Sequence, residues 1–192
     1  MYPLAIVPIL FSDTPALEYL KNSIQNSLPM QADIQNLQIN PDFAFNASRG
    51  QYNSTLILAK LLELFPRGTG VLKDYQRILG VTSCDLFIPI LTFVFGEAQL
   101  GGRVAVVSSY RLQNERYGLP KDQNLFHDRL AKESVHELGH TLGLIHCYNQ
   151  DCALHPSTYV EEIDLKSARC CHSCQENIFN KMGKDGETHP AG

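Results

Sequence analysis

Residues 136–146 read HELGHTLGLIH, and the interpretation of the whole chain starts from this stretch. Residues four apart on a helix lie on one face, so His136 and His140 point in the same direction. Two imidazoles placed in this way suit a tetrahedral zinc ion. Glu137 lies beside them and can reach a metal-bound water without itself binding the metal. The pattern therefore predicts a helix that carries two zinc ligands and a candidate base.

The residues after this helix supply a candidate third ligand. Gly143 can end the helix, because glycine tolerates the left-handed conformation that a chain reversal needs. The reversal would bring His146 back towards the metal. Three protein ligands leave the fourth position to water, which is typical of a catalytic zinc site. The alternative, a buried helix with ordinary histidines, explains neither Glu137 nor His146.

Four cysteines form two close pairs downstream of the histidines. Cys147 and Cys152 are separated by four residues, and Cys171 and Cys174 by two. Four thiolates in two close pairs are typical of a closed, structural zinc site. A disulfide framework is the alternative. It is disfavoured because the sequence shows no secretion signal and reducing compartments discourage disulfides.

The two remaining cysteines are not expected to bind metal. Cys170 adjoins Cys171, and only Cys171 has the two-residue gap to Cys174, so we assign Cys171 to the zinc site and leave Cys170 free. Cys84 stands alone in an apolar segment and is expected to be a core thiol.

The combined pattern resembles the archaemetzincins, a branch of the metzincin zinc peptidases. The resemblance rests on the run HExxHxxGxxHC, the cysteine pairs, and residues 84–89, 95–98 and 102–108. In that family three histidines bind a catalytic zinc, a glutamate is the general base and four cysteines bind a second zinc. The resemblance implies these roles, and thus two zinc ions per chain, for the following residues: His136, His140 and His146; Glu137; Cys147, Cys152, Cys171 and Cys174.

One position departs from the family pattern. Metzincins carry a methionine in a turn beneath the zinc, two residues after the second cysteine in this family, and Leu154 occupies that position here. Leucine is close to methionine in size and apolarity, and such exchanges in a packed core are usually mild. We expect the floor under the zinc to persist, with an effect on the fine tuning of the site.

Composition is that of an ordinary globular domain. The chain has 192 residues, 44% of them hydrophobic and 19% charged. A chain of this length can form one hydrophobic core without the help of disulfide bonds. The net charge of −4 argues against a nucleic-acid-binding surface, which would need a basic patch. No Lys or Arg precedes Lys21, so the apolar N-terminus is interpreted as a strand and not as a signal peptide. No apolar run is long enough to span a bilayer, and we expect a cytoplasmic protein.

Strands and helices alternate in the first half, which predicts an α/β fold with a mixed, mostly parallel, twisted sheet. Part of residues 93–102 is interpreted as an antiparallel edge strand or a plain hairpin, and the resemblance favours an edge strand that binds substrate. The expected strands span residues 4–10, 32–39, 85–88 and 103–109, and the expected helices span residues 15–28, 54–65, 71–79, 125–142 and 174–182.

The expected organisation is a single metzincin-like domain over residues 1–192. Residues 1–143 would form an upper subdomain with the sheet and the active-site helix. Residues 144–182 would form a small lower subdomain stabilised by the cysteine zinc, which replaces a hydrophobic core. Residues 183–192 are polar and glycine-rich and are expected to be a flexible tail.

The function predicted from these patterns is zinc-dependent hydrolysis of peptide bonds, with a zinc-bound water activated by Glu137. The alternative is a catalytically weak or inactive module that binds peptides or proteins on the same scaffold, a reading to which Leu154 gives some weight. Expected partners are a peptide or protein substrate, with no nucleic acid and no membrane, and the chain is expected to be a monomer.

Overall fold

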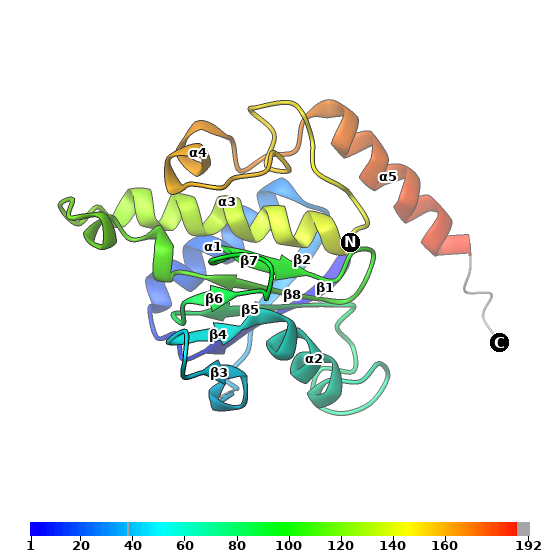
Figure 1. Cartoon of the computed structure of the whole chain (residues 1–192). Helices are drawn as coiled ribbons and strands as arrows, with labels where there is room; N and C mark the ends of the chain where they lie inside the picture. The colour runs from blue at the N-terminus through cyan, green and yellow to red at the C-terminus, as the bar shows by residue number, and fades with distance from the viewer. Residues whose placement is uncertain (38, 188–192) are drawn as a thin grey trace.

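The computed structural model describes residues 1–37 and 39–187, and side chains as far as Lys181. Its main sheet has five strands in the order β2-β1-β5-β8-β7 (Figure 1). The first four in this order are parallel, and β7 is an antiparallel edge strand paired with β8. The predicted mixed, mostly parallel sheet is confirmed. The strand bounds are β1 Tyr2–Ile9, β2 Met30–Ile34, β5 Arg77–Thr82, β7 Gly96–Ala98 and β8 Val104–Ser108.

The sheet separates two hydrophobic cores. Successive side chains of a strand point to opposite faces, so Leu4 and Ile6 of β1 enter one core while Ala5 and Val7 enter the other. Helices α1 and α3 cover the first face and α2 covers the second (Figure 1). The helix bounds are α1 Thr14–Ser27, α2 Ser54–Leu64 and α3 Gln123–Thr141.

Each of these helices is preceded by a residue whose side chain accepts a hydrogen bond from a backbone N–H of the first turn. Asp13, Asn53 and Asp122 occupy the N-cap positions of α1, α2 and α3. Such side chains satisfy backbone N–H groups that have no partner within the helix. The helices predicted over residues 15–28 and 54–65 are confirmed as α1 and α2, with bounds that differ by one residue at most.

The prediction of a helix over residues 71–79 is wrong. Arg77–Thr82 form β5, the central strand, which lies between β1 and β8. All six residues of β5 are buried, so its apolar residues run continuously and do not alternate. Leu72 and Leu79 are seven residues apart, a spacing that also fits a helix, so periodicity alone does not distinguish the two structures here.

A second, three-stranded sheet lies beside the main one. It contains β3 Phe45–Asn46, β4 Gln51–Asn53 and β6 Leu86–Phe87. The strand predicted for residues 85–88 therefore belongs to this smaller sheet. The strand predicted for residues 32–39 is also shorter and begins earlier, as β2.

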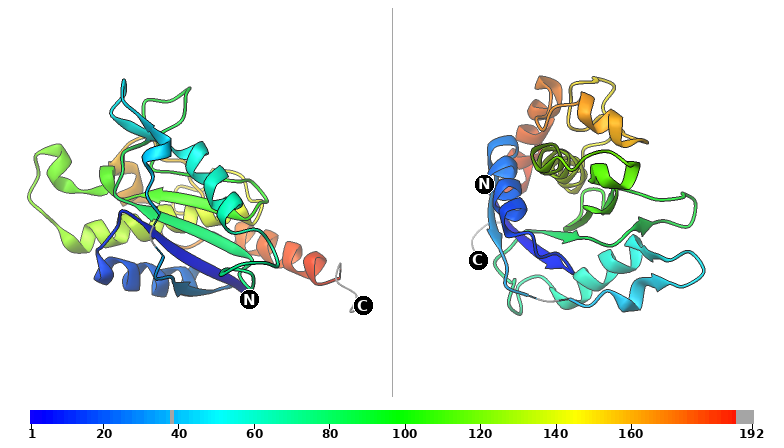
Figure 2. Two further views of the ribbon diagram at one scale, coloured as in Figure 1. Left: turned by 90° about the horizontal axis from the view of Figure 1, so that it is seen from below. Right: turned by 90° about the vertical axis from the view of Figure 1, so that its left-hand side faces the viewer.

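After α3 the chain forms a lower part with few regular elements, α4 Val160–Leu165 and α5 His172–Glu187. Figure 2 shows α3 end on, between the sheet and this lower part. Helix α5 runs past residue 182, so part of the segment predicted as a tail is helical; residues 188–192 lie outside the described residues. Within the described residues, no helix is both long enough and apolar enough to cross a membrane.

Candidate metal centres

Helix α3 carries the first two histidines, and His136 lines the wall of a cleft. Val135 and Leu138 of this helix are buried in the first core, which fixes its rotation. His136 and His140 consequently project from one face, with ring centroids 4.7 Å apart. His136 is only 6% exposed, so its ring is held by packing as well as by the helix.

Gly143 turns the chain as the sequence predicted. Its φ of 78° lies in the left-handed region, and the Leu144 N–H donates to the Gly139 carbonyl across the reversal. His146 then lies with its ring centroid 5.3 Å from that of His136. The structure brings the three histidines together, with one ring nitrogen of each lying within 4.8 Å of the others.

The hydrogen bonds of His136 and His140 determine their tautomers. Each Nδ1 lies 2.8 Å from a backbone carbonyl, that of Ala153 for His136 and that of Leu144 for His140. A carbonyl only accepts, so both Nδ1 atoms carry the proton and both Nε2 atoms present a lone pair. The two Nε2 atoms are 3.1 Å apart.

Two lone pairs facing each other at this distance repel unless a cation lies between them. Two nitrogens bound to one tetrahedral zinc at about 2.05 Å would be about 3.3 Å apart. Burial lowers the pKa of His136, His140 and His146, which keeps the rings neutral and able to bind metal. The donor set therefore fits a zinc ion.

Glu137 lies against the edge strand, where Gly96 leaves room for it. A methyl group on Gly96 would lie 2.6 Å from Glu137 Cγ and 2.7 Å from the Val106 carbonyl oxygen. Burial raises the pKa of the Glu137 carboxyl well above its usual range, and neighbouring Glu133 raises it further. A cation at the histidine centre would favour the ionised form. The need for glycine at residue 96 arises from tertiary packing, and the sequence analysis did not find it.

A buried ion pair lies beneath the histidines. Lys166 Nζ is 2.8 Å from a carboxylate oxygen of Glu133, and both side chains are almost fully buried. The same Nζ donates to the His155 carbonyl at 3.0 Å and lies 3.5 Å from His136 Nδ1. Lys166 follows α4, and nothing in its local sequence marks it as part of the site.

The cleft beside the histidines has a volume of about 320 Å³. Its upper wall is the segment 91–96, and Arg49 donates to the Leu91 and Thr92 carbonyls at 2.8 and 2.9 Å. Gly101, in the turn between β7 and β8, donates its N–H to the His140 carbonyl at 2.8 Å. The lower rim is formed by residues 156–158. Segment 91–96 is thus tied to the small sheet, and the turn that follows β7 is tied to α3.

Leu154 lies directly under α3 and is fully buried. A methyl group on Gly139 would lie 2.9 Å from a Leu154 methyl carbon, so the helix approaches this floor closely. The leucine fills the position beneath the histidines at which the family pattern has methionine.

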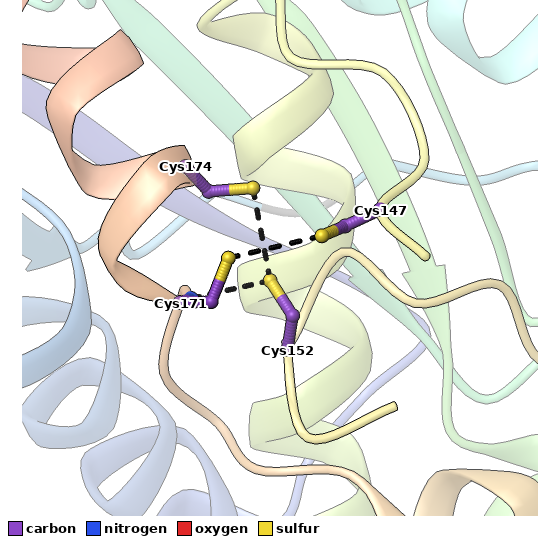
Figure 3. A group of neighbouring side chains, drawn as sticks. All are labelled: Cys147, Cys152, Cys171 and Cys174. Carbon is purple, nitrogen blue, oxygen red and sulfur yellow. Dashed lines mark hydrogen bonds between the residues drawn. The ribbon is translucent and has the colours of Figure 1, made fainter. Parts of the chain in front are cut away.

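The four predicted cysteines converge in the lower part (Figure 3). The Sγ atoms of Cys147 and Cys171 are 3.7 Å apart, and those of Cys152 and Cys174 are 3.8 Å apart. Four sulfurs bound to one tetrahedral zinc at about 2.3 Å would be separated by about 3.8 Å. The spacing fits a zinc ion and is far longer than the roughly 2.05 Å of a disulfide.

The other two cysteines lie outside this cluster. Cys170 is buried next to it, and burial together with the neighbouring thiols raises its pKa to about 12. Cys84 is buried in the upper part, as predicted for a core thiol. All six cysteines are free, so the alternative of a disulfide framework is not realised.

Comparison with known proteins places the chain in a family. Residues 22–180 match the model of Peptidase family M54. The archaemetzincin of Methanocaldococcus jannaschii is 38% identical over 178 residues, which cover 93% of each chain. That of Halobacterium salinarum is 38% identical over 181 residues, which cover 91% of this chain and 98% of the relative.

Solved structures agree with this assignment. The crystal structure of archaemetzincin from Methanopyrus kandleri has a TM-score of 0.79 and 32% identity, covering 95% of this chain and 96% of its own. The crystal structure of archaemetzincin from Archaeoglobus fulgidus complexed with malonate has a TM-score of 0.76 and 35% identity, covering 91% of this chain and 99% of its own. The chain therefore belongs to peptidase family M54, the archaemetzincin family of zinc metallopeptidases.

Proposed function

We propose that this chain hydrolyses peptide bonds at the histidine centre, with Glu137 as the general base. His136, His140 and His146 would hold the catalytic zinc. The observation that carries the proposal is the convergence of three histidine nitrogens beside a buried carboxylate in the wall of one cleft. Binding alone would not need a base at that position.

A zinc ion bound by these residues supplies a Lewis acid that polarises a carbonyl and lowers the pKa of water. Glu137 takes a proton from the water that attacks the scissile carbonyl and returns it to the leaving amine. The Ala153 and Leu144 carbonyls hold the rings of His136 and His140 in the metal-binding tautomer.

The edge strand β7 positions the substrate. No strand of the described residues pairs with its outer edge, so an extended peptide can add to the sheet by backbone hydrogen bonds. The strand runs directly beside Glu137, because Gly96 belongs to both features. Substrate pairing therefore brings a peptide bond close to the base.

The four cysteines would hold a second zinc with a structural role, which gives two zinc ions per chain. This ion would organise residues 144–182 as a lower subdomain under the upper subdomain, residues 1–143. All the proposed ligands come from one chain, so the site is complete in a monomer.

The test is digestion of a broad peptide mixture by the zinc-loaded protein, read by mass spectrometry. Glu137→Gln keeps the size of the side chain and is the matched control, with its zinc content measured in parallel. Loss of a general base is expected to lower the cleavage rate by about 10²–10⁴-fold. The positions of the new termini would distinguish internal from terminal cleavage.

Two outcomes would contradict the proposal. One is cleavage by Glu137→Gln at the parental rate, which would exclude Glu137 as the base. The other is no cleavage by protein that carries metal at both centres, which would favour a peptide-binding module on a peptidase scaffold.

A further inference from the structure

The third histidine is held differently from the first two. His136 and His140 stand on α3, whereas His146 follows the turn at Gly143, in a segment without regular structure. It is also the exposed member of the three, and its neighbour Ile145 is 72% exposed. Because packing covers so little of this segment, the position of His146 depends on the bonds that hold the turn at Gly143.

Lys181 of α5 supplies one of these bonds. Its Nζ donates to the Gly143 carbonyl at 2.5 Å, and no other donor within the described residues bonds to this oxygen. The turn lies two residues beyond the end of α3. The last carbonyls of a helix have no partner within it and carry a partial negative charge, so an ammonium group is stabilised there. Lys181 therefore both bonds to the turn and lies at the negative end of α3.

Gly143 is in close contact with two segments that are distant in sequence. A methyl group on Gly143 would lie 2.5 Å from Lys181 Nζ and 3.7 Å from Gly101 Cα. Gly101 belongs to the turn after β7, and its N–H donates to the His140 carbonyl. The turn that presents His146 is therefore held by two segments from elsewhere in the chain, and α5 contributes a charged side chain to it.

The packing of α5 places Lys181 at this turn. Cys174, Ile178 and Lys181 follow one another at spacings of four and three residues, so they lie on one face of α5. Cys174 belongs to the cysteine cluster (Figure 3), and Ile178 is 3% exposed and buried in the first core. These two contacts fix the rotation of α5. One face of the helix thereby connects the cysteine cluster, the core and the turn before His146.

We propose that Lys181 is a positioning residue of the histidine centre. Its bond to the Gly143 carbonyl holds the turn that brings His146 to the metal, and α5 connects this turn to the cysteine centre. The proposal rests on the three histidines as zinc ligands, as in the proposed function. Lys181 is not among the residues that line the cleft, so it acts through His146 and not on a substrate.

The test is the zinc affinity of each centre in the full-length chain, measured in chelator-buffered zinc. Side-chain NMR signals of the three histidines report on the histidine centre, and the Cβ signals of the four cysteines report on the cysteine centre. Neither measurement requires activity. Lys181→Met keeps the apolar stem and removes the charged donor, whereas Lys181→Arg keeps a charged donor. Lys60→Met, which removes an exposed lysine from α2, is the control.

Lys181→Met is expected to weaken zinc binding at the histidine centre about three- to tenfold, as loss of one exposed, charge-assisted hydrogen bond does. Zinc binding at the cysteine centre should stay at the parental affinity, because Lys181 lies two turns away from Cys174. Lys181→Arg should restore the affinity of the histidine centre, and Lys60→Met should leave both centres unchanged.

Parental affinity at the histidine centre of Lys181→Met would overturn this inference and leave the proposed function intact. Equal weakening of both centres would also overturn it, because Lys181 would then stabilise the lower part as a whole and not the histidine centre. A parental chain that binds zinc only at the cysteines would overturn the proposed function, and this inference with it.

Discussion

The upper part of the molecule, residues 1–143, and the lower part, residues 144–182, hold their candidate metal ligands in different ways. In the upper part, two histidines stand on a helix that is packed against a five-stranded sheet. In the lower part, the cysteine ligands come from loops and from the first turn of α5. The prediction that the cysteine zinc replaces a hydrophobic core is wrong, because Leu154, Val160 and Ile163 of the lower part are buried in the same core as α1 and α3. The histidine centre therefore stands mainly on a regular element, and the cysteine cluster stands mainly on loops that are packed against the same core.

The difference shows that the histidine centre depends on both parts. His146 comes from the lower part, as do the Ala153 carbonyl that fixes His136, the Leu154 floor and the Lys166 ammonium. A well-packed sheet is therefore not sufficient for catalysis. We therefore expect the cysteine cluster, with its zinc bound, to support the histidine centre by ordering the segment that completes it.

The largest effect is expected from Cys152→Ser. A structural zinc contributes on the order of 10 kcal/mol, so its loss should unfold the lower part while the sheet persists. Zinc content should fall, activity should disappear, and limited proteolysis should cut within residues 144–182. Cys170→Ala, which alters a buried thiol beside the cluster, is the control and should retain both ions. A protease-resistant Cys152→Ser protein would show that the lower part does not need its metal.

Next is Lys166→Met, which leaves the Glu133 carboxylate buried without a partner. Removing one member of a buried pair costs about 3–5 kcal/mol, to be measured by denaturant unfolding. The double variant with Glu133→Gln should recover much of this loss. Lys60→Met breaks an exposed pair with Glu63 and should cost no more than about 1 kcal/mol. If Lys166→Met and Lys60→Met lowered the free energy of unfolding equally, Lys166 would not support the site.

A smaller effect is expected from Gly96→Ala, which adds a methyl group where strand β7 contacts the Glu137 side chain. The added methyl group must displace Glu137 or strand β8, at a cost of about 1–3 kcal/mol. Turnover should fall about 10- to 100-fold with zinc content unchanged. In Gly102→Ala the atoms nearest to the new group belong to the flexible Gln99 side chain, which can move aside, and turnover should stay at the parental level. Parental turnover in Gly96→Ala would show that the base tolerates displacement.

The smallest effect is expected from Leu154→Met, which restores the residue of the family pattern. Exchanges that conserve volume usually cost less than about 1.5 kcal/mol, and the unbranched methionine can fit beneath Gly139. Melting temperature and turnover should change little. A gain in turnover of several orders of magnitude would instead indicate that leucine keeps the natural protein weakly active.

Local spacing was enough to predict the features that depend on local geometry. The four-residue step from His136 to His140 and the left-handed Gly143 follow from helix geometry, and α3 followed from them. The central strand β5 was missed because a strand buried on both faces has no alternation to distinguish it from a helix. Lys166 and Gly96 were missed for another reason: their roles depend on residues distant in sequence.

The hydrogen bond from Gly101 to His140 has a consequence for the substrates that can enter the cleft. Because this bond joins the turn after β7 to α3, and the contacts of Arg49 join segment 91–96 to the small sheet, the spacing between edge strand and metal is set before a substrate arrives. The lower rim, residues 156–158, is held to α4 by the Thr158 N–H, which donates to the Glu162 carboxylate. We therefore expect the cleft to accept unstructured segments and chain ends more readily than folded polypeptides.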